Sequence, residues 1–168
     1  MLATTIIALA LAATGLAQVP EGYRSVYMTS KQDAKFVVVP KSRAAGATLV
    51  VQTLTSKPEQ TWYIKSNATK IQLADTTLCM DAGAKSAWKD MAPITLKECD
   101  SSEGQKWIAM ADGRIAVDGS PGTQECIDLQ YLKAVQNNPV GLYNCAGLGN
   151  SGAADKGINW PLVNATAA

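Results

Sequence analysis

The sequence predicts an all-β protein built from three copies of one four-stranded unit. Two observations indicate this: a tryptophan triplet recurs, first after 45 residues, and two cysteine-containing segments recur with it. The triplets are Gln60-Thr61-Trp62, Gln105-Lys106-Trp107 and a degenerate Ile158-Asn159-Trp160. The segment Leu78-Cys79-Met80-Asp81 returns as Glu125-Cys126-Ile127-Asp128, and residues 94–99 return as 140–145. Function is therefore expected on surfaces that the copies repeat or have lost.

The copies are expected at about residues 23–66, 67–111 and 112–163, with no linker between them. The third copy is longer because residues 146–157, rich in Gly, Ala, Ser and Asn, form one inserted surface loop. Separate domains would need more chain than this. Residues 18–168 are therefore expected to form a single domain.

Short β-branched or alternating runs predict the strands of each copy. In the first copy the expected strands span residues 24–28, 36–39, 49–54 and 60–64. Each later copy has counterparts, such as the runs at residues 70–73 and 114–117. Turn signals interrupt the runs at Ser66-Asn67, Asp112-Gly113 and Asn138-Pro139. No stretch of ten residues after residue 20 has a convincing helical period, so the sequence predicts twelve strands.

Residues 1–17 are small and apolar and predict a secretory signal peptide with cleavage after Ala17, hence a secreted, extracellular protein. No segment reaches the roughly 20 apolar residues that a membrane span needs. Four cysteines and the sequons at Asn67 and Asn164 fit an oxidising route, and we expect N-glycosylation at both asparagines. A chance match remains the alternative for each sequon, more so for Asn164 near the terminus.

Composition excludes several classes of function. The formal net charge is +1 with dispersed Lys and Arg, which provides no basic face for nucleic acid. The chain contains no histidine, no Cys-x-x-Cys and no Cys/His cluster, which argues against a metal site and against Ser/His/Asp chemistry. We expect no metal, no cofactor and no enzymatic activity.

The order Leu-Cys-x-Asp, then apolar-x-Leu-x-x-Cys, then Gln-x-Trp resembles the ricin B-type lectin domains over residues 22–163. The resemblance implies a β-trefoil, in which a six-stranded barrel is capped by three hairpins. It also implies disulfides between Cys79 and Cys99 and between Cys126 and Cys145. Val37 and Leu54 stand at the corresponding positions of the first copy, where an apolar pair can replace the bridge.

Tryptophans at one position per copy are expected in the core, with the glutamines bonding nearby backbone groups. In lectins of this type the Asp of Cys-x-Asp accepts hydrogen bonds from the sugar, and the stacking ring lies two positions before the second cysteine. The third copy has both, as Asp128 and Tyr143, with Asn144 and Asn138 nearby. It is the predicted carbohydrate site, although Gly157-Ile158 replaces the family's Asn-Gln pair.

A weaker second site is predicted at Asp81, Gln105 and Trp88, with Lys97 in place of the ring and Gly104 in place of Asn. The alternative for Asp81 and Asp128 is that each only caps a turn. Trp88 can instead pack on its own hairpin. The first copy has Val39 and Gln52 at the key positions, so it is expected to be structural only.

The sequence thus predicts a secreted, non-enzymatic protein that binds glycans or glycoproteins, and it defines neither the sugar nor the oligomeric state. A β-trefoil protease inhibitor or other interaction protein is the alternative. Its inhibitory element would be residues 146–157, although the glycines there predict a loop too flexible for that role. A paired-carboxylate glycosidase has no support in the spacing, because the recurrent Asp residues occur once per copy.

Overall fold

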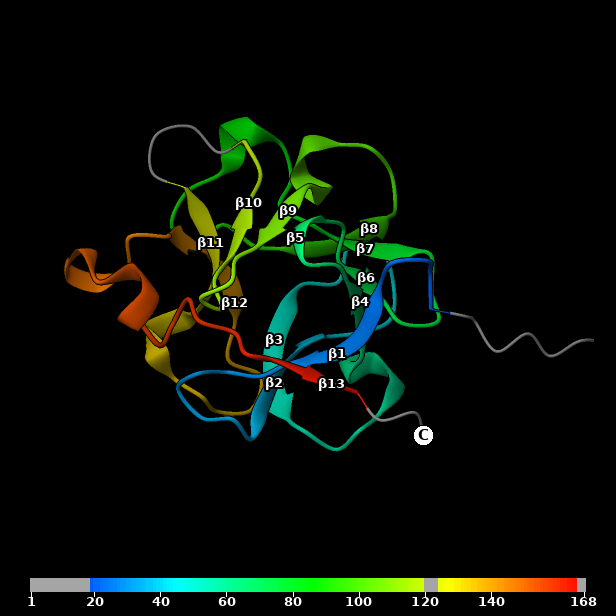
Figure 1. Ribbon diagram of the computed structural model, residues 1–168, viewed down its shortest axis with the longest axis horizontal. Coiled ribbons are helices and arrows are strands. Elements are labelled where there is room, and N and C mark those ends of the chain that lie inside the picture. Colours follow the sequence, from blue (N-terminus) through cyan, green and yellow to red (C-terminus); the bar gives the residue numbers. More distant parts are fainter. Residues whose placement is uncertain (1–18, 120–123, 166–168) are drawn as a thin grey trace, which may run out of the picture.

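The computed structural model describes residues 19–119 and 124–165, so the predicted signal peptide lies outside the described residues (Figure 1). The described part is all-β, with single-turn 3-10 helices between the strands. The strands are β1 Arg24–Met28, β2 Phe36–Pro40, β3 Leu49–Thr53, β4 Trp62–Ile64, β5 Asn67–Thr69, β6 Gln72–Leu73, β7 Leu78–Asp81, β8 Thr95–Glu98, β9 Trp107–Ala109, β10 Ile115–Val117, β11 Glu125–Leu129, β12 Val140–Asn144 and β13 Leu162–Asn164.

A barrel is formed by the first and last strands of the copies. β1 pairs with β4 and β13, β4 pairs with β6, β5 pairs with β9, and β9 pairs with β10, all antiparallel. The bridge between Arg114 and Asn159 joins β10 to the segment before β13 and completes the ring. In Figure 1 the last strand, β13, accordingly lies beside the first, β1.

Three hairpins, β2–β3, β7–β8 and β11–β12, form the second layer. They meet one another through isolated bridges between Thr48 and Thr95, Val50 and Pro139, and Pro93 and Gly141. Each hairpin therefore contacts both of the others, which is the cap of a β-trefoil. Among the described residues, no helix has the length and apolar composition that crossing a membrane requires.

The three repeated tryptophans fill the core, as predicted. Trp62, Trp107 and Trp160 are at most 1% exposed. Each indole N–H donates to a backbone carbonyl of the hairpin in its own copy, at Val38, Met80 and Ile127, over 2.9, 3.2 and 2.8 Å. These acceptors are equivalent positions, each one residue after Val37, Cys79 or Cys126. The bonds satisfy the indole N–H in a dry core and tie each hairpin to the barrel.

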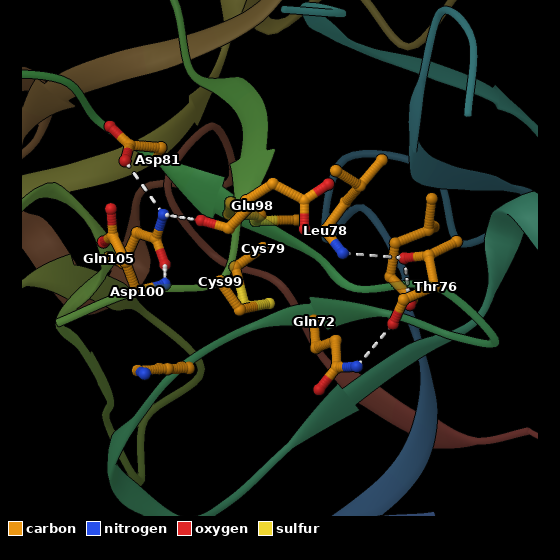
Figure 2. The surroundings of a disulfide bond; sticks show 12 residues. Gln72, Thr76, Leu78, Cys79, Asp81, Glu98, Cys99, Asp100 and Gln105 are labelled. Carbon is orange, nitrogen blue, oxygen red and sulfur yellow. Dashed lines mark hydrogen bonds between the residues drawn. A yellow bond between two sulfur atoms is a disulfide. The ribbon is translucent and has the colours of Figure 1, made fainter. Parts of the chain in front are cut away.

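The glutamines of the triplets bond the backbone, also as predicted. Gln60 donates to the Thr53 carbonyl at 2.8 Å and accepts from the Thr55 N–H at 2.7 Å. Gln105 does the same with Glu98 and Asp100, at 2.9 and 2.8 Å (Figure 2). The third copy has Ile158, fully buried against the disulfide of Cys126 and Cys145. In the third copy, apolar packing of Ile158 thus replaces the hydrogen bonds that the glutamine makes to the backbone in the other copies.

Both expected disulfides are present, Cys79–Cys99 and Cys126–Cys145, each within one copy. Each closes a loop of about 20 residues, which stabilises the fold by roughly 3 kcal/mol in the chain-entropy view. In the first copy Val37 is fully buried and Leu54 packs against its cluster. An apolar contact therefore occupies the equivalent position, as expected.

The strand prediction differs from the structure in detail. The described residues form thirteen strands, because β5 forms where a turn was expected at Asn67. β5 and β6 act as one interrupted strand whose first part pairs with β9 and whose second part pairs with β4. The expected strand 60–64 begins only at Trp62, since residues Pro58–Gln60 form a 3-10 turn that positions the Gln60 amide.

Candidate functional site

Asp128 and Tyr143 come from the two strands of the third hairpin and face one cavity. Tyr143 lies opposite Cys126 in the β11–β12 register, and Asp128 lies two residues further along β11. The cavity has a volume of about 220 Å³. Its lining residues are Met91, Asp128, Leu129, Tyr131, Leu132, Tyr143, Leu148 and Asp155. An acid and an aromatic ring predicted as partners are therefore brought together by the fold.

The Asp128 carboxylate is buried and lacks a side-chain partner within the described part of the chain. Its residue is 8% exposed. Burial, together with the negative charges of Asp155 and Asp90, raises the pKa of the carboxyl from 3.8 to about 7, although a backbone hydrogen bond from Leu129 acts in the opposite direction. That N–H also donates to the Gly157 carbonyl at 2.9 Å. Asp128 is thus available to a ligand to an extent unusual for a buried acid.

Gly157 explains the departure from the family's Asn. A Cβ at this position would lie 2.7 Å from Asp128 Oδ1 and 2.9 Å from Leu132 Cδ2, which is closer than side chains normally approach. Asp155 Oδ1 would be 3.2 Å from the same atom. The missing side chain therefore leaves room for two carboxylates at one wall of the cavity.

The inserted loop, residues 146–157, is folded against this wall rather than extended. Asp155 accepts hydrogen bonds from the backbone N–H groups of Leu148 and Gly157, at 2.7 and 2.8 Å. Asn159 donates to the Ala153 carbonyl at 2.8 Å. The glycine content predicted a flexible loop, but hydrogen bonds of the Asp155 and Asn159 side chains hold it in place. Two 3-10 turns, Leu148–Asn150 and Gly152–Ala154, give it a shape unlike the extended strand of a substrate-like inhibitor (orange in Figure 1).

Sequence reasoning missed Tyr131 and Leu132, which form another wall. Both have left-handed backbones, with φ of 53° and 57°, and this conformation is costly for non-glycine residues. Tyr131 is 76% exposed. An aromatic residue in the loop directly after Cys-x-Asp was the available signal. The sequence contains no such signal for Asp155, Leu148 and Met91, because they come from loops whose path the repeat does not predict.

The equivalent acid of the second copy, Asp81, is satisfied by the protein itself. Oδ1 accepts the Gly83 N–H at 2.6 Å. Oδ2 accepts from the Gln105 side chain at 3.1 Å (Figure 2). Lys97 Nζ lies 3.8 Å from Oδ2. Asp81, Lys97 and Gly104 line a cavity of about 310 Å³. The Gly83 contact is the turn cap expected as the alternative role of Asp81, and Gln105 and Lys97 occupy its other oxygen.

The remaining predicted site residues lie off these cavity walls. Asn144 accepts from the Ala146 N–H at 2.8 Å, and Asn138 donates to the Gln130 carbonyl at 2.9 Å. Trp88 packs against the core and donates to the Gly83 carbonyl at 3.1 Å, in agreement with the alternative that it packs on its own hairpin. Gln105 is fully buried. The structure thus brings together only Asp128 and Tyr143 of the predicted third-copy set.

The first copy shows no comparable arrangement. Val39, at the Asp position, is fully buried in an apolar cluster, and Gln52, at the ring position, donates to Asn137 at 3.1 Å. Of the predicted glycosylation sites, Asn67 is exposed in β5, and Asn164 in β13 accepts from Arg24 at 3.1 Å. The described residues contain no group of three or more potential metal ligands.

Comparisons with known proteins agree with the β-trefoil fold. No curated protein sequence matches the chain significantly. Among solved structures, a designed threefold symmetric protein, ThreeFoil, is similar with a TM-score of 0.69 and 14% identity over 83% of this chain and 98% of its own. The β-trefoil lectin of the Vibrio vulnificus hemolysin/cytolysin, solved with N-acetyl-D-lactosamine bound, has a TM-score of 0.63 and 13% identity over 88% and 99%.

A mosquitocidal holotoxin is similar with a TM-score of 0.69 and 18% identity over 86% of this chain, which spans only 17% of that longer protein. At these identities the likeness concerns the fold. The family is shown by sequence: the family described as "Ricin-type beta-trefoil lectin domain" matches residues 68–155, more than half of the chain. The chain belongs to the ricin-type β-trefoil lectin domain family.

Proposed function

We propose that the protein binds a carbohydrate in the cavity between Asp128 and Tyr143, without acting on it as an enzyme. One observation carries the proposal: Asp128 is buried at a cavity with no side-chain partner in the described part of the chain, whereas the equivalent Asp81 has its oxygens occupied. A sugar hydroxyl would supply the missing donor, and the Tyr143 ring would stack on the apolar face of a pyranose.

The family and the glycan-bound relative support carbohydrate as the ligand class. The two disulfides support passage through an oxidising compartment, and we propose that the protein is secreted. Its partners would be glycans or glycoproteins. A single shallow site binds weakly, so useful avidity would come from a multivalent glycan or from an oligomer.

A glycan array identifies the ligand, and titration of variants then tests the site. Tyr143→Ala and Asp128→Ala should each weaken binding by about 1 to 3 kcal/mol, from the lost ring contact and the lost hydrogen bonds. Gln52→Ala, at the ring position of the first copy, is the matched control and should bind as the parent does. Unfolding measured on the same samples separates loss of the site from loss of the fold.

If Tyr143→Ala and Asp128→Ala both bind with the affinity of the parent, the carbohydrate site lies elsewhere. Absence of any glycan ligand, combined with inhibition of a protease, would instead establish the inhibitor alternative. Recovery of the bound oligosaccharide intact after prolonged incubation tests the non-enzymatic part of the proposal.

A further inference from the structure

The second copy places a cation of its own beside its acid. Lys97 Nζ lies 3.8 Å from Asp81 Oδ2 and 3.7 Å from Asp100 Oδ2. Lys97 is paired with Cys79 in the β7–β8 register, just as Tyr143 is paired with Cys126 in β11–β12. Lys97 and Tyr143 therefore hold the same position in the two hairpins. Both copies place a glycine, Gly104 or Gly157, against the acid. In the second copy the position of Lys97 adds an ammonium group to this arrangement.

The third copy has replaced that cation with a ring and has added a second acid. Asp128 and Asp155, each 8% exposed, line the same cavity. Neither forms an ion pair within residues 19–119 and 124–165, where the ion pairs involve Lys97 and Arg114. Two buried carboxylates without a counter-charge repel each other and lose hydration, so a ligand that brings a positive charge relieves both effects.

The other groups around the cavity do not supply that charge. Asp90 adds a further negative charge near Asp128. Lys133 lies 5.9 Å from the centroid of the Tyr131 ring, on the exposed side of the turn, and pairs with neither acid. The remaining lining residues, Met91, Leu129, Leu132 and Leu148, are uncharged and apolar.

We propose that the third-copy cavity recognises an amino sugar through its free, protonated amine, which takes the position that the Lys97 ammonium occupies in the second copy. This rests on the proposed function and specifies its ligand class. The amine would donate to Asp128 and attract Asp155, while Tyr131 and Tyr143 offer ring faces to the sugar and to the cation. An N-acetylated sugar carries no positive charge, so it cannot neutralise the two acids.

The raised pKa of Asp128 supports this assignment. Burial and the charge of Asp155 hold the carboxyl partly protonated near pH 7. A bound ammonium group would lower the pKa of Asp128 again, so binding near pH 7 should release protons from the protein. A neutral sugar that accepts a hydrogen bond from the protonated acid would not release them.

The experiment is titration calorimetry with a glucosamine oligosaccharide, its fully N-acetylated form and a glucose oligosaccharide of equal length, in buffers that differ in ionisation enthalpy. The free amine should bind at least about tenfold more tightly than the N-acetylated form, because only the amine brings a positive charge to the two acids. Because the sugar amine itself titrates near neutral pH, the protons that Asp128 releases are measured as the difference in proton release between the parent and Asp128→Asn.

Asp128→Asn, which keeps the shape of the side chain, should abolish the preference for the amine. Asp33→Asn is the control for net charge, because Asp33 is in the first copy and its Oδ1 only accepts the Lys35 N–H. It should retain the preference.

Equal or tighter binding of the N-acetylated or glucose form would overturn the inference and leave the proposed carbohydrate function standing. An amine preference that survives Asp128→Asn would also overturn it, since the attraction would come from elsewhere on the surface. Failure of every glycan on the array to bind would remove the proposed function itself.

Discussion

Asp155 lies beside Asp128 at one wall of the third-copy cavity, and its negative charge adds to the effect of burial on the Asp128 carboxyl. The two acids come from parts of the chain with different origins, one from the repeated hairpin and one from the inserted loop. The loop holds Asp155 through backbone N–H groups of Leu148 and Gly157. The insertion thus completes the cavity and gives it an electrostatic character that the second copy lacks.

This pair predicts a pH-dependent stability. Because the pKa of Asp128 is raised in the folded protein, the folded state binds the proton more tightly than the unfolded state does. The associated stability is fully present below about pH 4 and is lost as pH rises through about 7. The loss is on the order of 4 kcal/mol for a shift of this size.

Denaturant unfolding of the parent and of Asp128→Asn across this pH range measures the effect. The difference between the two isolates Asp128 from Asp112 and Asp100, whose pKa values are lowered by hydrogen bonds from Arg114 and Ser102 and whose contributions have the opposite slope at low pH. A difference in free energy of unfolding that does not change with pH would show that Asp128 titrates normally.

The core predicts a large cost for Trp107→Ala. The side chain is fully buried and its indole N–H donates to the Met80 carbonyl. Removing it empties a large aromatic site and should lower the free energy of unfolding by about 3 to 5 kcal/mol. Trp88→Ala is the comparison: that ring is only partly buried, so its loss should cost clearly less. Equal costs, measured by chemical denaturation, would contradict the assignment of Trp107 to the core.

Gly104 and Gly157 hold equivalent positions in the second and third copies, and replacing each by alanine should affect glycan binding differently. A Cβ on Gly157 would meet Asp128 Oδ1 at 2.7 Å, and a Cβ on Gly104 would meet the Gly83 carbonyl at 2.6 Å. Both Gly157→Ala and Gly104→Ala should therefore destabilise the fold by about 1 to 3 kcal/mol. Only Gly157→Ala should also weaken glycan binding, because only it displaces Asp128. Parallel unfolding and binding titrations compare the two, and a loss of binding in Gly104→Ala would place a site in the second copy.

The sequence predicted what the repeat controls. Equivalent positions in the copies account for four correct predictions. These are the buried tryptophans, the glutamine contacts, the pairing of Cys79 with Cys99, and the replacement of a bridge by Val37 and Leu54. The start of β5 was missed because its pairing with β9 is a long-range contact between segments with no strong local pattern. Tyr131 was missed because its orientation depends on a left-handed backbone, which composition does not indicate for tyrosine.

Asp155 was missed for a different physical reason. It belongs to an insertion without a counterpart in the other copies, so no alignment of the repeats could place it near Asp128. A different limit applies to Asn138 and Asn144, which were predicted from proximity in sequence alone. In the structure their amides bond the backbone of Gln130 and Ala146. Their role as carbohydrate ligands stays a prediction.

The strained turn at Tyr131 and Leu132 predicts that stability and binding can be separated. A left-handed conformation costs a tyrosine about 1 to 2 kcal/mol, and glycine adopts it freely. Tyr131→Gly relieves this cost but increases the freedom of the unfolded chain. Because the side chain is 76% exposed, little packing is lost with it. The free energy of unfolding should therefore change by less than about 1 kcal/mol.

The same change removes one wall of the cavity, so glycan affinity should fall several-fold, which corresponds to about 1 kcal/mol. Tyr131→Phe keeps both the ring and the strain and should bind as the parent does if stacking is the contribution. A variant that binds normally after Tyr131→Gly would show that the strained turn serves the fold alone. Loss of binding in both variants would instead assign the contribution to the hydroxyl of Tyr131, which acts by hydrogen bonding rather than by stacking.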